Sequence, residues 1–267
     1  MEKIDLAILG ATSGEIAPLC ALFRPSRNFK IAGNTFSIHL YRDLRVLIGT
    51  TGVGKVNAAA TAAAALSSFR AAEVWNVGCA GAYSGSGLEI GDVLITLSCI
   101  CGDEGILGQN GAMPTSRLGI PLVQKDSRLF YDFFPLDELL SRRQIPALLP
   151  AGVYSLGASG AIHSHAPGQD IEKGRVFKIQ YGPNVTVGMV SGDIQTAAAR
   201  ALSYGALAEN MEGSAIAQTC LLFDVPFLEL RGISNMAGVR DKAEWDLGAA
   251  LDHCRAVIKD LWDRLLF

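Results

Sequence analysis

The sequence predicts an α/β fold in which helices cover both faces of a mixed, mostly parallel β-sheet. Apolar runs rich in β-branched residues alternate with alanine-rich helical stretches along the chain, which is the pattern of successive strand–helix–strand units. The chain has 267 residues and 49% of them are hydrophobic, so a sizeable core can form. We expect a single domain, 1–267, with an excursion at about 102–150, where Gly, Pro and charged residues replace the periodic pattern.

Strands are predicted where apolar residues run together between turn residues. A hairpin is expected at 35–50, turning at Arg42 and Asp43, and it makes the sheet mixed. Further strands are expected at IDLAILG (4–10), EVWNVGC (73–79), VTVGMVSG (185–192), ALAENM (206–211) and VPFLELRGIS (225–234).

Helices are predicted in the stretches that follow these runs. They are expected at EIAPLCALF (15–23), KVNAAATAAAALSSF (55–69), IQTAAARAL (194–202) and EGSAIAQTCLLF (212–223), with a last helix from about Ala243. The alanines of the second helix are small enough to let it lie close to the sheet.

Charge and cysteine usage limit the kinds of partner. The formal net charge is -3, from 23 Lys and Arg against 26 Asp and Glu. These charges are spread along the chain and form no basic stripe of the kind that binding to nucleic acid or to an anionic membrane requires. The six cysteines form no Cys-x-x-Cys pair and are expected to be buried free thiols of a reducing compartment. Neither a signal peptide nor a membrane span is recognisable. We expect a cytoplasmic protein with a small-molecule ligand.

The ligand of an open α/β sheet binds beyond the carboxyl ends of its strands, so the residues after each apolar run are candidates for a site. These residues are Gly10 to Glu15, Thr50 to Lys55, Cys79 to Tyr83, Ser191 to Asp193, Met211 with Glu212, and Ser234 with Asn235.

The stretch GTTGVGKV, residues 49–56, resembles two nucleotide-binding motifs and satisfies neither. A P-loop requires Ser or Thr after the lysine to hold Mg²⁺, and this chain has Val56. A dinucleotide fingerprint requires a third glycine where Asn57 stands. What remains is a glycine turn that feeds the N-terminus of a helix, and it is either a structural turn or a ligand loop.

Two carboxylates follow predicted strands directly. Glu15 is either an acid that the dipole of the following helix stabilises or a general base that deprotonates water. Glu212 is either a helix N-terminal acid or the acceptor of two vicinal ribose hydroxyls.

Other polar residues receive less specific interpretations. We expect His163 and His165 to form an exposed loop pair rather than a metal site, because no third ligand stands in a motif-like position. Asp103 and Glu104 are expected to face solvent, and Trp245 to fill the core or an interface. Neither a metal nor a cofactor is expected.

Taken together, these motifs make the chain resemble the superfamily of purine nucleoside phosphorylases and nucleosidases, and within it the nucleosidase branch. The segments that carry the resemblance are AILGATSGE, GTTGVGKVNAAATAAAAL, NVGCAGAYSGSGLEIGDVLI, VSGD, ENMEGSAIAQTC and VPFLELRGISN, in the order and spacing of that superfamily. The resemblance implies a three-layer α/β/α sandwich, a nucleoside bound at the sheet edge, and a homodimer or larger homo-oligomer.

The resemblance also implies roles for individual residues. Glu15 matches the acid that activates water, and Met211 with Glu212 match the pair that packs under the ribose and binds its hydroxyls. The backbone along the base is matched by Cys79, Ala80 and Gly81, and Val53 and Ser234 complete the expected substrate contacts. Phosphorylases hold phosphate in the corner that Glu15 occupies, and a carboxylate repels phosphate, so hydrolysis is favoured.

Asn235 departs from the adenosine-type nucleosidases, which carry Asp at this position. An amide NH₂ can donate to a 6-keto oxygen while the amide carbonyl accepts from a protonated N7, which matches hypoxanthine or guanine. A mismatch here costs roughly 1–3 kcal/mol per unpaired group. A second departure is Gln195, which stands where the adenosine enzymes stack an aromatic ring on the base.

Asn235 with the following GVRDKAEW makes the chain similar to the futalosine hydrolases of the futalosine route to menaquinone. Their substrate is an inosine-type nucleoside with a carboxyphenyl-ketone tail, and hydrolysis yields hypoxanthine and dehypoxanthine futalosine. Three alternatives stay open: a methylthioadenosine/adenosylhomocysteine-type nucleosidase, a purine nucleoside phosphorylase, and, in a different class, a non-catalytic nucleotide-binding module.

Overall fold

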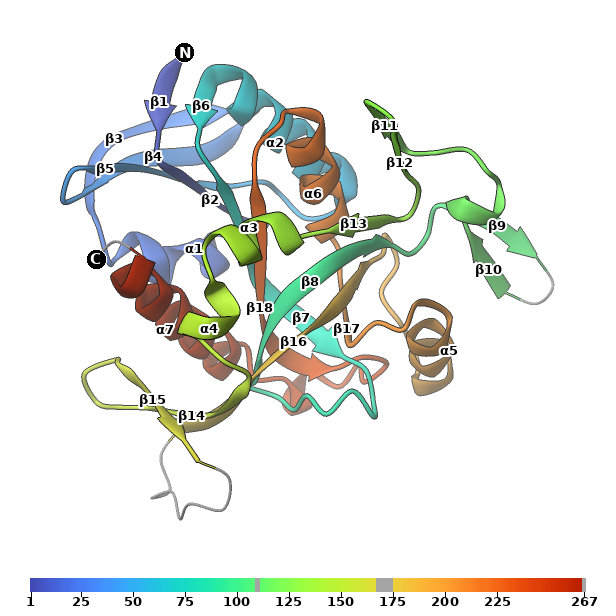
Figure 1. Cartoon of the computed structure of the whole chain (residues 1–267). Helices are drawn as coiled ribbons and strands as arrows, with labels where there is room; N and C mark the ends of the chain where they lie inside the picture. Colours follow the sequence, from blue (N-terminus) through green and yellow to red (C-terminus); the bar gives the residue numbers. More distant parts are fainter. Residues whose placement is uncertain (109–110, 167–174, 266–267) are drawn as a thin grey trace.

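The computed structural model describes residues 1–108, 111–166 and 175–265. A 12-stranded sheet forms its centre (Figure 1). The path of neighbouring strands is β15 (Ile162–His165), β14 (Gly152–Leu156), β16 (Arg175–Thr186), β8 (Val93–Cys101), β18 (Phe227–Met236), β7 (Val74–Ala82), β2 (Leu6–Gly10), β5 (Leu44–Thr50), β4 (Asn34–Tyr41) and β3 (Arg24–Ile31). Strand β13 (Phe133–Pro135) pairs with β8, and β17 (Ala208–Asn210) pairs with β16 and β7.

The sheet is mixed, as predicted. Strands β18, β7, β2 and β5 are parallel neighbours, whereas β8 runs antiparallel to β18 and parallel to β16. The expected hairpin is present as β4 and β5, which pair from Tyr41 with Leu44 onward, and Arg42 has a φ of 53° at the turn. The inner strands are buried on both faces, which explains their nearly continuous apolar sequences.

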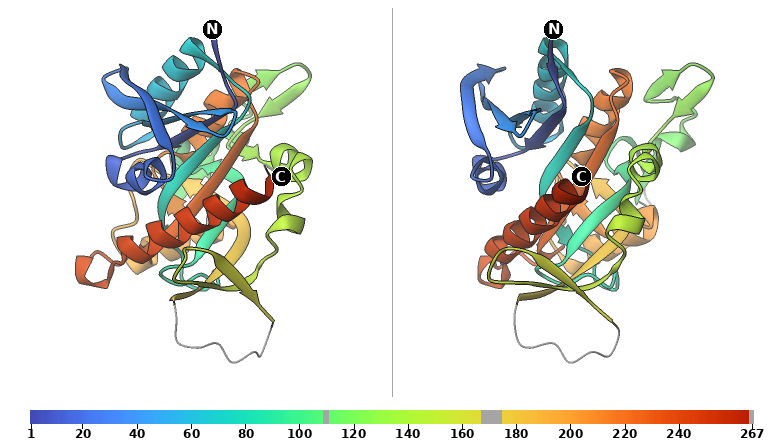
Figure 2. Two further views of the ribbon diagram at one scale, coloured as in Figure 1. Left: turned by 90° about the vertical axis from the view of Figure 1, so that its left-hand side faces the viewer. Right: turned by 60° about the vertical axis from the view of Figure 1, so that its left-hand side comes forward.

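Helices cover both faces, so the predicted three-layer arrangement is confirmed. Gly232 of β18 faces α7 (Leu247–Leu265), because a Cβ there would collide with the backbone of Ala250. Glu229 faces α6 (Gly213–Leu222), because a Cβ on Gly213 would collide with its carboxylate. Positions 229 and 232 point to opposite faces of a strand. Figure 2 shows α7 crossing in front of the strands.

The helices that cover the two faces of the sheet pack through different side chains. On one face α1 (Ser13–Cys20) packs beside α7, which buries Ala250, Cys254, Val257 and Leu261 at helical spacing. On the other face α2 (Lys55–Ser68) packs on α6 through Ala58, Ala62 and Ala65. The predicted helices are thus present, although α7 begins at Leu247, after a short 3₁₀ turn η2 (Lys242–Glu244).

The excursion leaves the sheet after β8 and returns to it. Its elements are the hairpin β9 (Gly105–Gly108) and β10 (Gly111–Pro114), η1 (Thr115–Arg117), the hairpin β11 (Val123–Lys125) and β12 (Arg128–Phe130), then β13, α3 (Asp137–Arg142) and α4 (Ile145–Leu148). Both hairpins project from the body in Figure 1. Residues 109–110 of this segment lie outside the described part of the chain. A single domain stays a prediction.

The remaining elements are β1 (Glu2–Ile4), which pairs with β6 (Phe69–Ala71), and α5 (Ile194–Tyr204). His163 and His165 lie in the strand β15, because the β14–β15 hairpin includes them. The expected loop is therefore wrong, although His163 is exposed as predicted. Cysteines 20, 79, 99, 101, 220 and 254 are free, and all but Cys20 and Cys79 are buried. No helix in the described part of the chain has both the length and the apolar character needed to cross a membrane.

Candidate active site

A pocket of about 580 Å³ opens where β2, β7 and β18 end. It is large enough for a nucleoside, since small-molecule sites enclose roughly 300–1,000 Å³. Every residue expected to touch substrate lines it: Glu15, Val53, Cys79, Ala80, Gly81, Met211, Glu212, Ser234 and Asn235.

One strand reaches the pocket by a different route from that expected. β17 runs antiparallel to β7, with Ala208 opposite Ala82 and Glu209 opposite Gly81. After Glu209 the chain therefore runs toward the N-terminal end of β7, and this direction places Met211 and Glu212 in the pocket lining. They do not stand at a carboxyl end shared with β7.

Glu15 both caps its helix and faces the pocket. Its Oε2 accepts hydrogen bonds from the backbone N and the Oγ1 of Thr12, at 2.8 and 3.1 Å. Its Oε1 points across the sheet edge and accepts from the backbone N of Cys79 at 3.2 Å. A Cβ on Gly78 would collide with this oxygen, so the glycine is what lets the carboxylate lie over β7. The helix-cap and functional interpretations use different oxygens of one carboxylate.

Glu212 is buried at the start of α6, 6% exposed. The backbone N of Gly54 donates to its Oε1 at 2.9 Å, and the guanidinium of Arg231 lies 4.0 Å from its Oε2. Burial raises the pKa of Glu212, while Arg231 and the Gly54 N–H oppose that rise. The glycine turn of GTTGVGKV thus donates an amide to a carboxylate of this chain, and its Val53 also lines the pocket, so the turn has a structural role at the edge of the site.

Arg231 is a site residue that the sequence analysis missed. Its side chain is 1% exposed, and its Nη2 lies 2.9 Å from the Oε2 of Glu229, which is fully buried. Asn76, Thr96 and Asn184 also donate to Glu229, at 2.9, 3.0 and 2.9 Å. Buried charges are retained only when paired in this way. The signal was visible as a Glu and an Arg inside the apolar run VPFLELRGIS.

Asn235 lies at a bulge of β18, where the pairing with β7 shifts after Ile233. The Ser234 hydroxyl donates to its Oδ1 at 2.9 Å, and its Nδ2 donates to the carbonyl of Met236 at 3.0 Å. Asn235 is 8% exposed and its Nδ2 lies 3.1 Å from the position that a Cβ on Gly81 would take. The amide is therefore oriented before any ligand arrives, with one N–H and one lone pair still available.

A second buried carboxylate, Glu209, holds the wall of the pocket. It accepts from the backbone N and the hydroxyl of Ser191, both at 2.7 Å, from the Tyr83 hydroxyl at 3.0 Å and from Arg200 at 3.3 Å. These bonds fix the loop that carries Val190 into the pocket lining. Gln195 is exposed on α5 and does not line the pocket.

The Cys79 thiol is not activated. Burial and the neighbouring carboxylate of Glu15 raise its pKa to about 11, so it remains protonated near neutral pH. Its backbone serves the site instead, through the N–H that binds Glu15.

Three further expectations have an outcome in the structure. Asp103 and Glu104 stand outside the pocket lining, and Asp103 is exposed as expected; Lys55 of α2 pairs with both, at 3.0 Å for Glu104. Trp245 lines the pocket rather than filling the core. His165 accepts or donates a hydrogen bond with Ser155 away from the pocket, and no group of three His, Cys, Asp or Glu in the described part of the chain could hold a metal ion.

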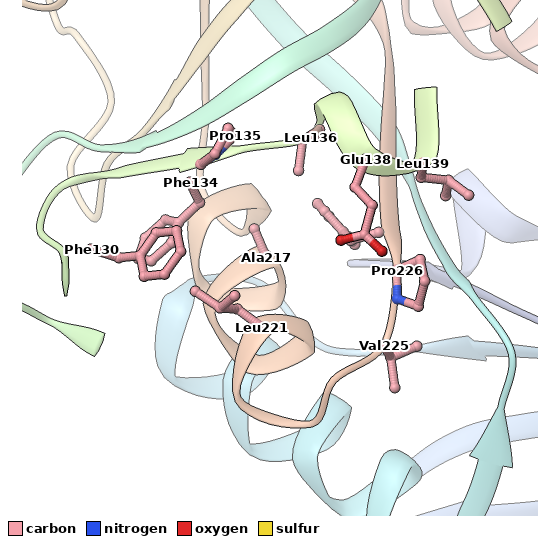
Figure 3. Close-up of a pocket in the computed structure, with 11 residues that line it drawn as sticks. Phe130, Phe134, Pro135, Leu136, Glu138, Leu139, Ala217, Leu221, Val225 and Pro226 are labelled. Carbon is pink, nitrogen blue, oxygen red and sulfur yellow. The ribbon is translucent and has the colours of Figure 1, made fainter. Parts of the chain in front are cut away.

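A smaller hollow of about 80 Å³ lies between α3, β13 and α6. Figure 3 shows the Glu138 carboxylate pointing into it among apolar side chains such as Leu139, Ala217 and Pro226. It is too small for a nucleoside and offers one ionisable group, so the chemistry belongs to the larger pocket.

Comparisons with known proteins identify the family of the chain. Residues 5–266 match the phosphorylase superfamily. The futalosine hydrolase of Thermus thermophilus is 31% identical over 237 residues, which cover 86% of this chain and 88% of that protein. The 5'-methylthioadenosine/S-adenosylhomocysteine nucleosidase of Mycobacterium bovis is 27% identical over 88% of this chain and 87% of its own.

Solved structures share the fold. The native futalosine hydrolase of Helicobacter pylori has a TM-score of 0.74 at 21% identity and covers 98% of each chain. The methylthioadenosine/adenosylhomocysteine nucleosidase of Colwellia psychrerythraea in complex with adenine has a TM-score of 0.73 at 23% identity, covering 98% of this chain and 96% of its own. The chain belongs to the phosphorylase superfamily, as one of its N-glycosyl hydrolases that cleave nucleosides.

Proposed function

We propose that this enzyme hydrolyses the N-ribosidic bond of futalosine to hypoxanthine and dehypoxanthine futalosine. The observation that carries the proposal is the orientation of Asn235 in the pocket. The Ser234 hydroxyl donates a hydrogen bond to its side-chain carbonyl at 2.9 Å, and its amide NH₂ donates one to the backbone carbonyl of Met236 at 3.0 Å. The remaining N–H can donate to a 6-keto oxygen, and the remaining lone pair can accept from N7–H of hypoxanthine.

Adenine would be recognised poorly by this amide. The exocyclic 6-amino group is a donor where hypoxanthine presents an acceptor, so it would face the free N–H of Asn235. Leaving a buried donor unpaired costs roughly 1–3 kcal/mol. This favours an inosine-type substrate over the adenosine-type substrates of the methylthioadenosine/adenosylhomocysteine nucleosidases, whose chemistry is otherwise the same.

Bond cleavage is assigned to three groups. Glu15 aligns and deprotonates the attacking water with the oxygen that faces Cys79. Glu212 accepts hydrogen bonds from the ribose hydroxyls, and Arg231 keeps it ionised from 4.0 Å away. Asn235 donates to the 6-keto oxygen and so stabilises the negative charge that grows on the base as the bond to the sugar breaks and the sugar becomes oxocarbenium-like. The departing base then takes a proton from solvent at N7.

Hydrolysis is favoured over phosphorolysis by the charges around the pocket. Glu15, Glu209 and Glu212 line it, and the buried guanidinium of Arg231 is already paired with Glu229. Arg240, the cation among the described lining residues, is exposed on the segment between β18 and α7, away from the buried carboxylates of Glu209 and Glu212. A phosphate placed beside these carboxylates would be repelled.

We further infer that the enzyme acts in the cytoplasm as a homodimer or larger homo-oligomer and supplies a precursor of menaquinone. The 31% identity to the futalosine hydrolase from Thermus thermophilus supports futalosine as the substrate in this route.

One assay separates the candidates. The enzyme is incubated with futalosine, inosine or methylthioadenosine, with and without phosphate, and the free base and sugar product are identified by chromatography. Hypoxanthine released from futalosine at a rate independent of phosphate is expected. Release of adenine from methylthioadenosine in preference would make the adenosine-type alternative correct, phosphate-dependent release would make the enzyme a phosphorylase, and binding of ATP with Mg²⁺ without any base release would indicate a nucleotide-binding module.

A further inference from the structure

The pocket has a buried floor and an exposed rim. Glu212 and Asn235 on the floor are 6% and 8% exposed. The rim is built by the segment that leaves β18 and enters α7, and its lining side chains are Arg240, Trp245, Leu247 and Leu251. On the proposed function the base faces Asn235 and the ribose faces Glu212, which leaves the exposed rim for a bulky 5'-substituent.

Arg240 differs in charge from the rest of the pocket. Among the described residues that line the pocket it is the one cationic side chain, and the carboxylates of Glu15, Glu209 and Glu212 line the other walls. Its guanidinium lies over the Trp245 ring, 5.0 Å from the centroid. The described residues provide no carboxylate partner for Arg240. Its hydrogen-bonding edge is free to bind an anion.

Trp245 is held in a fixed orientation. Its indole N–H donates to the carbonyl of Val239 at 3.1 Å, and the next residue, Asp246, donates its backbone N–H to the carbonyl of Ser234 at 2.9 Å. The rim is thus tied to the strand that carries Asn235. An aromatic platform and an arginine stacked on it are in place before ligand binds, which reduces the entropy lost on binding.

Neighbouring cations do not offer the same arrangement. Arg231 is buried and paired with Glu229. Lys242 lies two residues after Arg240 on the same turn, is exposed, and is not among the residues that line the pocket. Arginine also matches a carboxylate better than lysine does, because its planar fork can make two parallel hydrogen bonds.

We propose that Arg240 and Trp245 form a subsite for an aromatic carboxylate on the 5' side of the nucleoside. Arg240 binds the carboxylate, and Trp245 with Leu247 and Leu251 packs against the aromatic ring. The inference rests on the proposed function, because futalosine is the nucleoside that carries a carboxyphenyl tail. It adds a second determinant of specificity, separate from the base-reading amide, that a neutral alkylthio substituent would not satisfy.

The test compares futalosine with its methyl ester, which has the same base, ribose and ring but lacks the charge. kcat/KM for both substrates is measured for the wild type, Arg240→Gln, Arg240→Lys and the matched control Lys242→Gln. The wild type and Lys242→Gln should prefer futalosine by roughly tenfold to hundredfold, the range of a charge-assisted hydrogen bond. Arg240→Gln should lose this preference through a higher KM for futalosine, and Arg240→Lys should recover part of it.

The outcomes separate the two proposals. If the wild type hydrolyses futalosine and Arg240→Gln keeps the same preference over the ester, the subsite is wrong and the proposed function stands. An equal loss in Lys242→Gln and Arg240→Gln would also overturn the subsite, because it would indicate a diffuse effect of positive charge. If the wild type releases no hypoxanthine from futalosine, the proposed function fails and the subsite fails with it. Thermal unfolding at the wild-type temperature is expected for each variant, since both side chains are exposed.

Discussion

The hydroxyl of Ser234 donates a hydrogen bond to the side-chain carbonyl of Asn235 over 2.9 Å. Both residues are buried at the floor of the pocket, 2% and 8% exposed, so water does not compete strongly for this bond. Together with the bond from Nδ2 to the carbonyl of Met236, which can only accept, this bond sets which N–H and which lone pair of the amide remain for a ligand.

Asn235→Asp should reverse the preference for the base. A carboxylate accepts from the 6-amino group of adenine and repels the 6-keto oxygen of hypoxanthine, so the ratio of kcat/KM for inosine-type over adenosine-type nucleosides should fall by roughly tenfold to hundredfold. Competition assays with inosine and adenosine measure this ratio. Ser234→Ala, which removes only the orienting bond, should lower both rates without reversing the ratio. An unchanged ratio in Asn235→Asp would reject the base-reading role.

Glu15→Gln should reduce kcat by roughly 10²–10⁴-fold while substrate binding is largely retained, because an amide cannot take the proton from water. Glutamine can still accept the hydrogen bonds from Thr12, since it serves in capping boxes, so α1 should remain folded. Single-turnover rates and calorimetric binding of inosine measure the two effects. Glu138→Gln, in the small hollow, is the matched control and should behave as wild type. Near-normal turnover of Glu15→Gln would remove Glu15 from the mechanism.

Arg231→Met should destabilise the fold by roughly 3–5 kcal/mol, because it leaves the Glu229 carboxylate buried without its cation. The double variant Arg231→Met/Glu229→Gln removes both charges and should regain most of this stability in urea unfolding. Activity should stay low in both variants, since Glu212 has lost the guanidinium 4.0 Å away. Recovery of activity together with stability would show that Arg231 matters only for folding.

Gly78→Ala should lower activity strongly, because its Cβ would collide with the Glu15 carboxylate and with the Arg231 guanidinium. The matched control is Gly14→Ala, where a Cβ would meet only the Thr12 Oγ1 at 3.8 Å and the helix would gain propensity. kcat and the thermal midpoint are measured for both. Equal activity of the two variants would contradict the close approach of Glu15 to β7.

Binding of ribose should depend on the raised pKa of Glu212. The buried carboxylate is protonated at a higher pH than an ordinary glutamate, mainly through desolvation, and a protonated Glu212 loses acceptor capacity for two hydroxyls. In the slow Glu15→Gln background, inosine affinity should therefore fall as pH decreases through a value above 4.5. Hypoxanthine, which has no ribose, should bind equally across the same range. A parallel loss for both ligands would assign the titration to another group.

Much of the architecture follows from local pattern. The alternation of apolar runs with alanine-rich stretches predicted the strands and helices of the sandwich, because burial on both faces of a central strand requires a continuous apolar sequence. The position of a polar residue after such a run also predicted which side chains line the pocket, Asn235 among them, although their roles remain predictions.

Local pattern failed where the partner lies far along the chain. The ion pairs of Lys55 with Asp103 and Glu104 were not predicted, because a partner on another element cannot be assigned from spacing. The antiparallel direction of β17 relative to β7 was not predicted either, because the sequence of a three-residue strand does not indicate its direction.

The sequence by itself determined the layered fold and the residues at the strand ends that line the pocket, the amide Asn235 among them, because each depends on hydrophobic periodicity or on its place after an apolar run. Only the tertiary structure decided that Gly54 would hold Glu212, that Arg231 would be paired with Glu229 beneath it, and that Arg240 would stack on Trp245 at the rim. Those contacts depend on the distance and burial of groups that the folded sheet brings together, and burial decides how strongly charges interact.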